Sequence, residues 1–424
     1  MKLPYLLILF FFVLSCDKDE TIDIITNSED YNGYLYTTTN STFESAKSEK
    51  EFWSNRLRKD SSGVGDLGPL ANAYAAMFTA SGEVLYLKNA EIIYRKAIKI
   101  SAHSKDSYIR SLAQNLISQH RFVEAKKILE ESLKGASNKR AIQHILFDVY
   151  MELGEYKTAD KTLLKLKNKN DYNYLIRLAK RNDHKGNLEG AIQNLTEAMK
   201  IADSRKSKTL QIWTYTNLAD FYGHSGQIKK AYNLYLKTLK IQSDNNYAKK
   251  QIAWILYSYE KNPLEANSII DSIMVNNKSP EYYLFKADLA DFDGNTSGSN
   301  KFKEKFIKSA SNEDYGIMYT SYLIELYSET NPKLALELAI QEVNNRATPE
   351  TYSLLAYSQL INGDKSKALL TIEKYVIGKT FEPKSLYYSA IIYKENKNYK
   401  KEKELNDELL KAAFELGPLI MNEL

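Results

Sequence analysis

Few of the side chains that commonly do chemistry in proteins are arranged for it in this chain of 424 residues. The most suggestive spacing is that of His184 and His224, each of which lies two residues before a glycine and near an aspartate. Imidazole and carboxylate groups are the usual ligands of zinc. On adjacent helical units the two histidines would lie about 10 Å apart, too far to share one ion. We therefore expect neither a metal site nor a cofactor.

The segment Asp291-Phe292-Asp293-Gly294 has the composition of a calcium-binding loop. Placing Gly294 at the required glycine puts Leu289 and Asn300 where the first and last ligands must stand, so the ligand set fails. We interpret the segment as an elongated turn. Because the sequence also lacks a Walker loop, a nucleophile elbow, an HExxH motif and a CxxC motif, we expect no catalytic residue and no enzyme activity.

The only cysteine, Cys16, follows a short positive start at Lys2 and an apolar run from Leu3 to Leu14. This order is typical of an export signal, and the run is too short to span a membrane. The segment Val13-Leu14-Ser15-Cys16 resembles the lipobox of bacterial lipoproteins. The resemblance implies that residues 1–15 are a signal peptide removed before Cys16, and that Cys16 carries the lipid.

The residues after Cys16 indicate where in the cell the protein is delivered. Lys18, Asp19 and Glu20 resemble the surface-export signal of lipoproteins in one group of Gram-negative bacteria. The resemblance implies a lipid-anchored protein of the bacterial outer membrane, exposed at the cell surface. An aspartate directly after the lipidated cysteine signals inner-membrane retention in other bacteria, so the leaflet stays open.

Residues 16–62 are polar and rich in Ser, Thr, Asn, Asp and Lys. We interpret them as the lipidated N-terminus and a flexible tether, within which Glu44 to Arg58 has the apolar spacing of a first helix. The 58 basic and 53 acidic residues give a net charge of only +5. Such a mixed balance gives no support for nucleic-acid binding, and we expect none.

A small residue recurs along the rest of the chain with apolar residues four and seven or eight positions later. The alanines that meet this test lie 32 to 40 residues apart, with one double interval of 69, at positions Ala90, Ala125, Ala159, Ala191, Ala231, Ala266, Ala335 and Ala368. Each unit contains two helical patterns with a turn such as Gly226-Gln227-Ile228 between them. One helix pair cannot bury its own apolar face, so successive pairs must stack.

These units resemble the tetratricopeptide repeat, most closely in a set of seven residues: Tyr215, Leu218, Ala219, Tyr222, Gly226, Ala231 and Tyr235. The resemblance implies an all-α fold, a right-handed α-α superhelix of about ten helix-turn-helix repeats. We assign residues 63–424 to this array, closed by a C-terminal capping helix in which Glu402 takes the usual alanine position. Three departures are expected: a long first turn at 81–87, a long helix or loop around 202–208, and a long turn at 293–299.

The concave face of such an array is where a partner would bind, and the repeat register places eight residues there: Trp213, Thr216, Asp220, His224, His184, Lys180, His144 and Asp148. Trp213 is the best candidate for contact because tryptophan is enriched where binding energy concentrates. Trp254 occupies a small-residue position and is expected to pack in the interior. None of the matching helix positions carries the Lys and Asn pattern with which some tetratricopeptide domains hold C-terminal carboxylates.

The sequence thus favours a non-catalytic scaffold that binds a protein or peptide and is held to the envelope by its lipid. Two alternatives stay open: a lipoprotein that captures glycans or other nutrients, and an assembly factor for envelope complexes. The partner, the pathway and the oligomeric state are not indicated by any motif.

Overall fold

The computed structural model describes residues 23–36, 39–57, 63–102, 105–135 and 138–424. Every regular element within these ranges is a helix, and none is a strand. The all-α fold class is therefore confirmed. Residues 1–15, Cys16, Lys18, Asp19 and Glu20 lie outside the described residues, so the signal peptide, the lipid and the export signal stay predictions.

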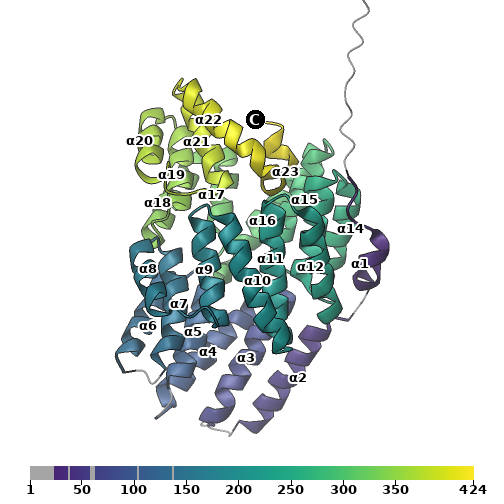
Figure 1. Ribbon diagram of the computed structural model, residues 1–424, viewed down its shortest axis with the longest axis vertical. Coiled ribbons are helices and arrows are strands. Elements are labelled where there is room, and N and C mark those ends of the chain that lie inside the picture. The colour runs from purple at the N-terminus through teal and green to yellow at the C-terminus, as the bar shows by residue number, and fades with distance from the viewer. Residues whose placement is uncertain (1–22, 37–38, 58–62, 103–104, 136–137) are drawn as a thin grey trace, which may run out of the picture.

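From residue 64 onward the described helices pack in consecutive pairs, as expected for a helical repeat (Figure 1). The first five pairs are α3 (Val64–Ser81) with α4 (Val84–Ile100), α5 (Lys105–Ser118) with α6 (Phe122–Gly135), α7 (Lys139–Glu152) with α8 (Tyr156–Lys165), α9 (Tyr172–His184) with α10 (Leu188–Ser204), and α11 (Lys208–His224) with α12 (Ile228–Ile241).

The sixth pair is α13 (Asn246–Trp254), continued by a π-helical turn η1 (Ile255–Tyr259), with α14 (Pro263–Met274). The remaining pairs are α15 (Glu281–Phe292) with α16 (Thr296–Ala310), α17 (Thr320–Thr330) with α18 (Pro332–Asn345), α19 (Pro349–Ile361) with α20 (Lys365–Tyr375), and α21 (Pro383–Glu395) with α22 (Tyr399–Leu409). A last helix, α23 (Ala413–Met421), follows. The predicted number of about ten repeats is confirmed.

All eight alanines that revealed the period lie in the second helix of a pair, and each is 0% exposed. A side chain no larger than a methyl group lets the two helices of a pair approach closely, which is why the position repeats. In α16 the same place is taken by Ser299, which is also 0% exposed. The unit with no alanine therefore keeps the small residue that the packing requires.

Two of the three expected departures are wrong. Helix α3 ends at Ser81 and α4 begins at Val84, so the first turn is short. Helix α16 already begins at Thr296, because the side chain of Asn295 accepts a hydrogen bond from Gly298 N and caps the helix. Around residues 202–208 the helices are long, since α10 and α11 have 17 residues each.

Part of the segment expected to be a flexible tether is instead helical and packed against the array. Helix α1 (Ser28–Leu35) lies against α12 and α14, and Tyr31 in it is 1% exposed. Helix α2 (Ser41–Arg56) packs along α3, as the predicted first helix would. The polar composition suggested a flexible segment, but asparagines cap both helices and the polar groups of the segment form hydrogen bonds to the array.

The array curls until its C-terminal repeats rest on its N-terminal repeats (Figure 1). Lys278 N donates to Ser81 O at 2.6 Å, and Arg346 Nη1 lies 3.7 Å from Glu152 Oε2. Asn277 Nδ2 reaches Ala80 O, 197 residues away in the chain. Successive turns of the superhelix therefore touch, and they enclose a narrow lumen.

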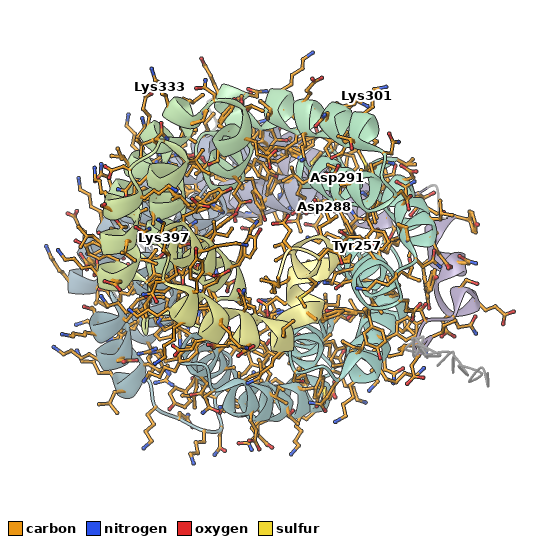
Figure 2. The ribbon with its side chains drawn as sticks, turned by 90° about the horizontal axis from the view of Figure 1, so that it is seen from above. Tyr257, Asp288, Asp291, Lys301, Lys333 and Lys397 are labelled. Carbon is orange, nitrogen blue, oxygen red and sulfur yellow. The ribbon has the colours of Figure 1, made fainter. Side chains whose placement is uncertain are left out.

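Helix α23 does not continue the outer wall. It bends toward the middle of the ring when the molecule is seen from above (Figure 2) and contacts α11, η1 and α15. Among the described residues, no helix is both long and apolar enough to cross a membrane.

Candidate functional site

Two cavities open on the inside of the superhelix, where the first helices of the pairs face one another. The larger has a volume of about 470 Å³ and the smaller about 270 Å³. Helices from widely separated repeats line them, and His224 and Glu415 belong to both linings. The lumen therefore gathers side chains from repeats far apart in the chain, and we take it as the candidate functional site.

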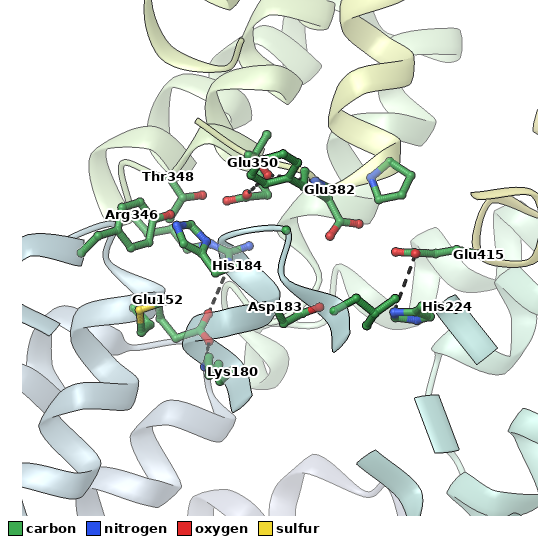
Figure 3. A pocket seen from close by; sticks show the side chains of 17 residues that line it. Glu152, Lys180, Asp183, His184, His224, Arg346, Thr348, Glu350, Glu382 and Glu415 are labelled. Carbon is green, nitrogen blue, oxygen red and sulfur yellow. Dashed lines mark hydrogen bonds and ion pairs between the residues drawn. The ribbon is translucent and has the colours of Figure 1, made fainter. Parts of the chain in front are cut away.

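The larger cavity lies where two turns of the superhelix meet (Figure 3). One side comes from the C-terminal ends of α7 and α9 and the turn at Gly186. The other comes from the loop before α19 and the loop before α21, which carries Phe381 and Glu382. A Cβ atom at Gly186 would come within 2.8 Å of the Phe381 ring, so a glycine is needed for this close approach.

One wall of the larger cavity holds charges that neutralise one another. Lys180 Nζ lies 2.8 Å from Glu152 Oε1, and Arg346 Nη1 lies 3.7 Å from Glu152 Oε2. Burial acts to raise the pKa of Glu152, but Lys180 and Arg346 outweigh it and hold that pKa below its usual value. This wall is an ion-pair network that fixes the two turns of the superhelix against each other.

The opposite wall is acidic and lacks a matching set of cations. Burial raises the pKa of Glu415 to about 7, helped by nearby Asp183. Loss of solvent around the carboxyl group, followed by the charge of Glu415, raises the pKa of Glu382 to about 7. The side chain facing this wall is His224, whose Nδ1 lies 3.7 Å from Glu415 Oε2 (Figure 3). At neutral pH this wall therefore holds carboxyl groups that gain from a proton or a cation.

The smaller cavity combines aromatic and acidic side chains. Trp254, Phe285 and Tyr322 line it, and the rings of Trp254 and Phe285 lie 5.6 Å apart. Burial raises the pKa of Asp288, also in this lining, to about 7. Apolar rings beside polar groups that fix orientation are the usual composition of a ligand-binding cavity.

The cavities contain four of the eight residues predicted for the groove. Lys180 and His184 line the larger one, Asp220 the smaller, and His224 both. Asp220 is well coordinated, since it accepts hydrogen bonds from the hydroxyls of Tyr235 and Tyr247, among others. The His184 ring contacts the Tyr156 ring in the cavity wall in a tilted arrangement, at a centroid distance of 4.0 Å.

The other four predicted residues line neither cavity. Trp213 is 40% exposed and meets a neighbouring tyrosine edge-on. Thr216 is buried, and its hydroxyl donates to backbone carbonyls of its own helix. Asp148 forms a 2.6 Å ion pair with Arg177. His144 is 5% exposed, and burial lowers its pKa to about 4, so it is a neutral interior histidine near pH 7.

Sequence reasoning missed the residues that come from the second turn of the superhelix, Arg346, Glu350, Glu382 and Glu415. Arg346 lies 194 positions from its partner Glu152, and Glu415 lies 191 positions from His224, so no spacing within one repeat points to them. Trp254, expected in the interior, is only partly buried: it packs against the core, lines the smaller cavity, and its indole donates to Phe414 O at 2.9 Å. The sequence signal for this second role was absent.

Among the described residues, no three His, Cys, Asp or Glu side chains gather closely enough to hold a metal ion. The described linings of the two cavities also contain no serine or cysteine. The side chains present in the two linings can hold a ligand by hydrogen bonds, ring contacts and charge.

No family model and no curated protein matches the chain. Solved structures do resemble it. A human IFIT1 dimer with m7Gppp-AAAA aligns over 78% of this chain and 75% of its own, with 12% identity and a TM-score of 0.47. Pseudomonas aeruginosa pilF aligns over 49% of this chain and 94% of its own, with 16% identity and a TM-score of 0.37.

A tetratricopeptide repeat protein from Parabacteroides merdae aligns over 72% of this chain and 98% of its own, with 17% identity and a TM-score of 0.34. At such identities and TM-scores the matches tell nothing of what this chain binds. The assignment of the fold rests on the helix pairs themselves and on the buried small residue that recurs in them.

Proposed function

Because the chain folds as a tetratricopeptide-type array of helix pairs, we propose that it is a non-catalytic scaffold that binds a protein or peptide in its lumen. We further propose that lipid on Cys16 anchors it to a bacterial outer membrane, on the cell surface. The observation that carries the proposal is the pair of cavities inside the superhelix, lined by side chains from both of its turns.

The charge of the lumen supports a polypeptide ligand over a nucleic acid. Asp183, Asp288, Glu382 and Glu415 all line the cavities with raised pKa values. A phosphate backbone would bring more negative charge to this surface, whereas nucleic-acid sites offer dense basic residues. A polypeptide can offer N–H donors, basic side chains and rings to the same surface.

The N-terminal helix supports an anchor that holds the array close to the membrane. The described chain begins at residue 23, and Ile25 N and Thr26 N already donate to Glu260 on the array. Six residues lie between Cys16 and residue 23 in the sequence, which makes seven residue steps. Fully extended they span at most about 25 Å, so a lipid at Cys16 would keep the array beside the bilayer.

The binding proposal is tested with the mature protein immobilised and exposed to envelope extract. We expect a defined partner whose recovery falls at least about tenfold in Asp183→Lys, since 1.4 kcal/mol suffices for that change. Asp293→Lys, on an exposed outer turn, serves as the matched control. Equal recovery by both variants, or no specific partner at high protein concentration, would contradict a binding lumen.

The anchor proposal has a separate test. In Cys16→Ala cells the protein should move from the membrane fraction to the soluble fraction, because two or three acyl chains anchor stably and none remains. Protease added to intact wild-type cells should digest the array if it faces the medium. A Cys16→Ala protein that stays in the membrane fraction would show that the anchor is wrong.

The two alternatives predict different observations. A glycan-capture protein should bind a glycan array and lose binding on Trp213→Ala, yet Trp213 stands outside both cavities. An envelope assembly factor should lower outer-membrane protein levels when depleted. The lumen therefore favours polypeptide binding over glycan capture.

A further inference from the structure

The C-terminal segment, residues 413–424, occupies part of the lumen. Helix α23 lies across the first helices of successive pairs, contacting α11, η1 and α15, and it meets α21 at the other end of the array (Figure 2). In a helical repeat array this inner face is the surface left open for a ligand. Here a piece of the same chain covers it.

The contact is centred on the main chain of Phe414. Trp254 Nε1 donates to Phe414 O at 2.9 Å, and Ser258 Oγ donates to the same oxygen at 2.7 Å. Two side-chain donors therefore hold one backbone carbonyl, which any polypeptide could present. The Phe414 ring lies against Gly223, where a Cβ atom would approach it to 2.5 Å.

The helix that supplies both donors is irregular at this place. Helix α13 gives way to the π-helical turn Ile255–Tyr259, directly after Trp254 and with Ser258 in it. Wider turns of this kind are rare and occur mostly at functional sites. The irregularity supports a surface shaped for binding rather than for repeat packing alone.

The segment also divides the lumen. His224 and Glu415 belong to the linings of both cavities and face each other at 3.7 Å, Nδ1 to Oε2. Phe414 lines the smaller cavity only. Without residues 413–424 the two cavities lose the wall that they share and become one longer groove.

The segment has two parts, which Gly417 separates with φ 76°, and a 3₁₀ turn at Leu410–Ala412 joins it to α22. The second part, which includes Ile420 and Leu424, packs in a hydrophobic cluster with α21 and α22. The first part, Ala413 to Glu415, is only partly buried. A stretch with few buried side chains opens at low free-energy cost compared with a packed repeat, so the first part is the one that a ligand can displace.

We propose that residues 413–424 are an internal ligand of the peptide-binding lumen, which a partner polypeptide displaces to reach Trp254 and Ser258. The inference rests on the proposed function and adds the partner's chemistry. A partner that replaces Phe414 at this surface presents a backbone carbonyl to Trp254 and Ser258 and an aromatic ring to the space beside Gly223. The displaced segment leaves the two cavities continuous.

The covalent link between the segment and α22 sets how strongly the segment competes with a free ligand. A segment on a short linker acts at an effective concentration in the millimolar range, so a free copy of the same sequence is excluded at micromolar concentration. A substitution that weakens binding of the internal segment should let a free peptide of the same sequence bind in its place. The experiment compares peptide binding with and without such a substitution.

The test uses the full mature chain and a fluorescent synthetic peptide of residues 410–424. Binding is followed by anisotropy to wild type and to Phe414→Ala. We expect the peptide to bind Phe414→Ala at least about tenfold more tightly than wild type, since the internal copy no longer competes well. Adding Trp254→Phe to Phe414→Ala should remove a donor and weaken that binding again.

A matched control and a second readout guard against a folding defect. Phe52→Ala removes an exposed ring on α2, which lines neither cavity, and should bind the peptide as weakly as wild type. Hydrogen exchange of residues 413–421 should accelerate in Phe414→Ala while α11 and α15 stay protected. Equal peptide binding by wild type and Phe414→Ala, or no binding by either, would overturn the proposal.

The two proposals can fail separately. If the peptide binds Phe414→Ala but no envelope protein is recovered by either chain, the internal ligand stands and the scaffold function is wrong. If a partner is recovered equally by wild type and Phe414→Ala, and the peptide does not compete with it, the partner binds elsewhere and the internal-ligand proposal is wrong.

Discussion

Charged side chains in this protein divide into those that are paired and those that face the lumen. Arg177 pairs with Asp148, and Lys286 pairs with Asp271, so most interior charges carry a partner. Asp288 differs, because burial raises its pKa to about 7 and the nearby lysines only partly oppose that rise. A carboxyl group kept in such a place costs stability, which proteins commonly tolerate at functional sites.

The cost at Asp288 gives a pH-dependent prediction. Below about pH 4 the Asp288 carboxyl is protonated in both the folded and the unfolded chain. Between about pH 4 and 7 it ionises only in the unfolded chain. Its contribution to the free energy of unfolding is therefore lost as pH rises across that window. We expect Asp288→Asn to be more stable than wild type by about 1–2 kcal/mol at pH 8 and equal to it at pH 4, by urea unfolding.

The exposed Asp293→Asn is the control for this measurement and should track wild type at every pH. If Asp288→Asn gains no stability at pH 8, the carboxyl is already neutralised by its lysine neighbours, and the acidic character of the smaller cavity is wrong.

At the scale of elements, the sixth repeat pair is the point where both ends of the described chain are held. Glu260, just after η1, accepts hydrogen bonds from Ile25 N and Thr26 N, each at 2.7 Å, and from the Thr26 hydroxyl at 2.8 Å. Trp254, just before η1, holds the C-terminal segment from the inner side. One irregular helix therefore fixes α1 on its outer side and α23 on its inner side.

Removing the Glu260 carboxylate should release α1 and leave the array folded. Hydrogen bonds to a charged group contribute about 1.5–3 kcal/mol, so Glu260→Ala should raise hydrogen exchange of residues 25–35 by roughly tenfold or more. Exchange in α9 to α12 should not change. Glu304→Ala, an exposed position on α16, is the control. Unchanged exchange in α1 would mean that the contacts of Tyr31 and Tyr232 suffice to hold the helix.

At the scale of the whole molecule, closure of the superhelix depends on glycines at the seam between its turns. Gly154 has φ 73° in the turn after α7, and a Cβ atom there would lie 2.5 Å from Ala347 O. Gly226 has nearly the same φ, 74°, but nothing lies within 4 Å of its Cβ position. The two turns are alike locally and differ only in the contact across the seam.

This pair separates local strain from closure. Alanine at Gly154 or at Gly226 should lower the free energy of unfolding by about 1–2 kcal/mol, because the left-handed conformation is unfavourable for a residue with a Cβ. Gly154→Ala should cost about 1–3 kcal/mol more, since the seam must open or distort. Thermal unfolding of the two variants checks the difference. Equal loss of stability would show that the two turns do not depend on contact at this point.

The sequence by itself determined the repeat, since the buried alanines and turn glycines are set by how closely two neighbouring helices must approach. It placed Lys180, His184, Asp220 and His224 on the lumen because a fixed position in each repeat faces the same way. Trp213 lines neither cavity, and its role in the groove stays a prediction. The sequence did not reveal the packing of residues 23–57, whose polar side chains find partners far along the chain.

Only the tertiary structure decided which residues meet in the lumen. A superhelix sums small rotations between neighbouring pairs, and no single repeat records the sum, so Glu382 and Glu415 could not be placed beside Asp183. The same holds for α23, since no motif in the sequence indicates that residues 413–421 turn inward onto Trp254. Packing between neighbouring helices follows from the 34-residue repeat of the sequence. Closure of the superhelix and occupation of its lumen follow from contacts between residues about 200 positions apart in the chain.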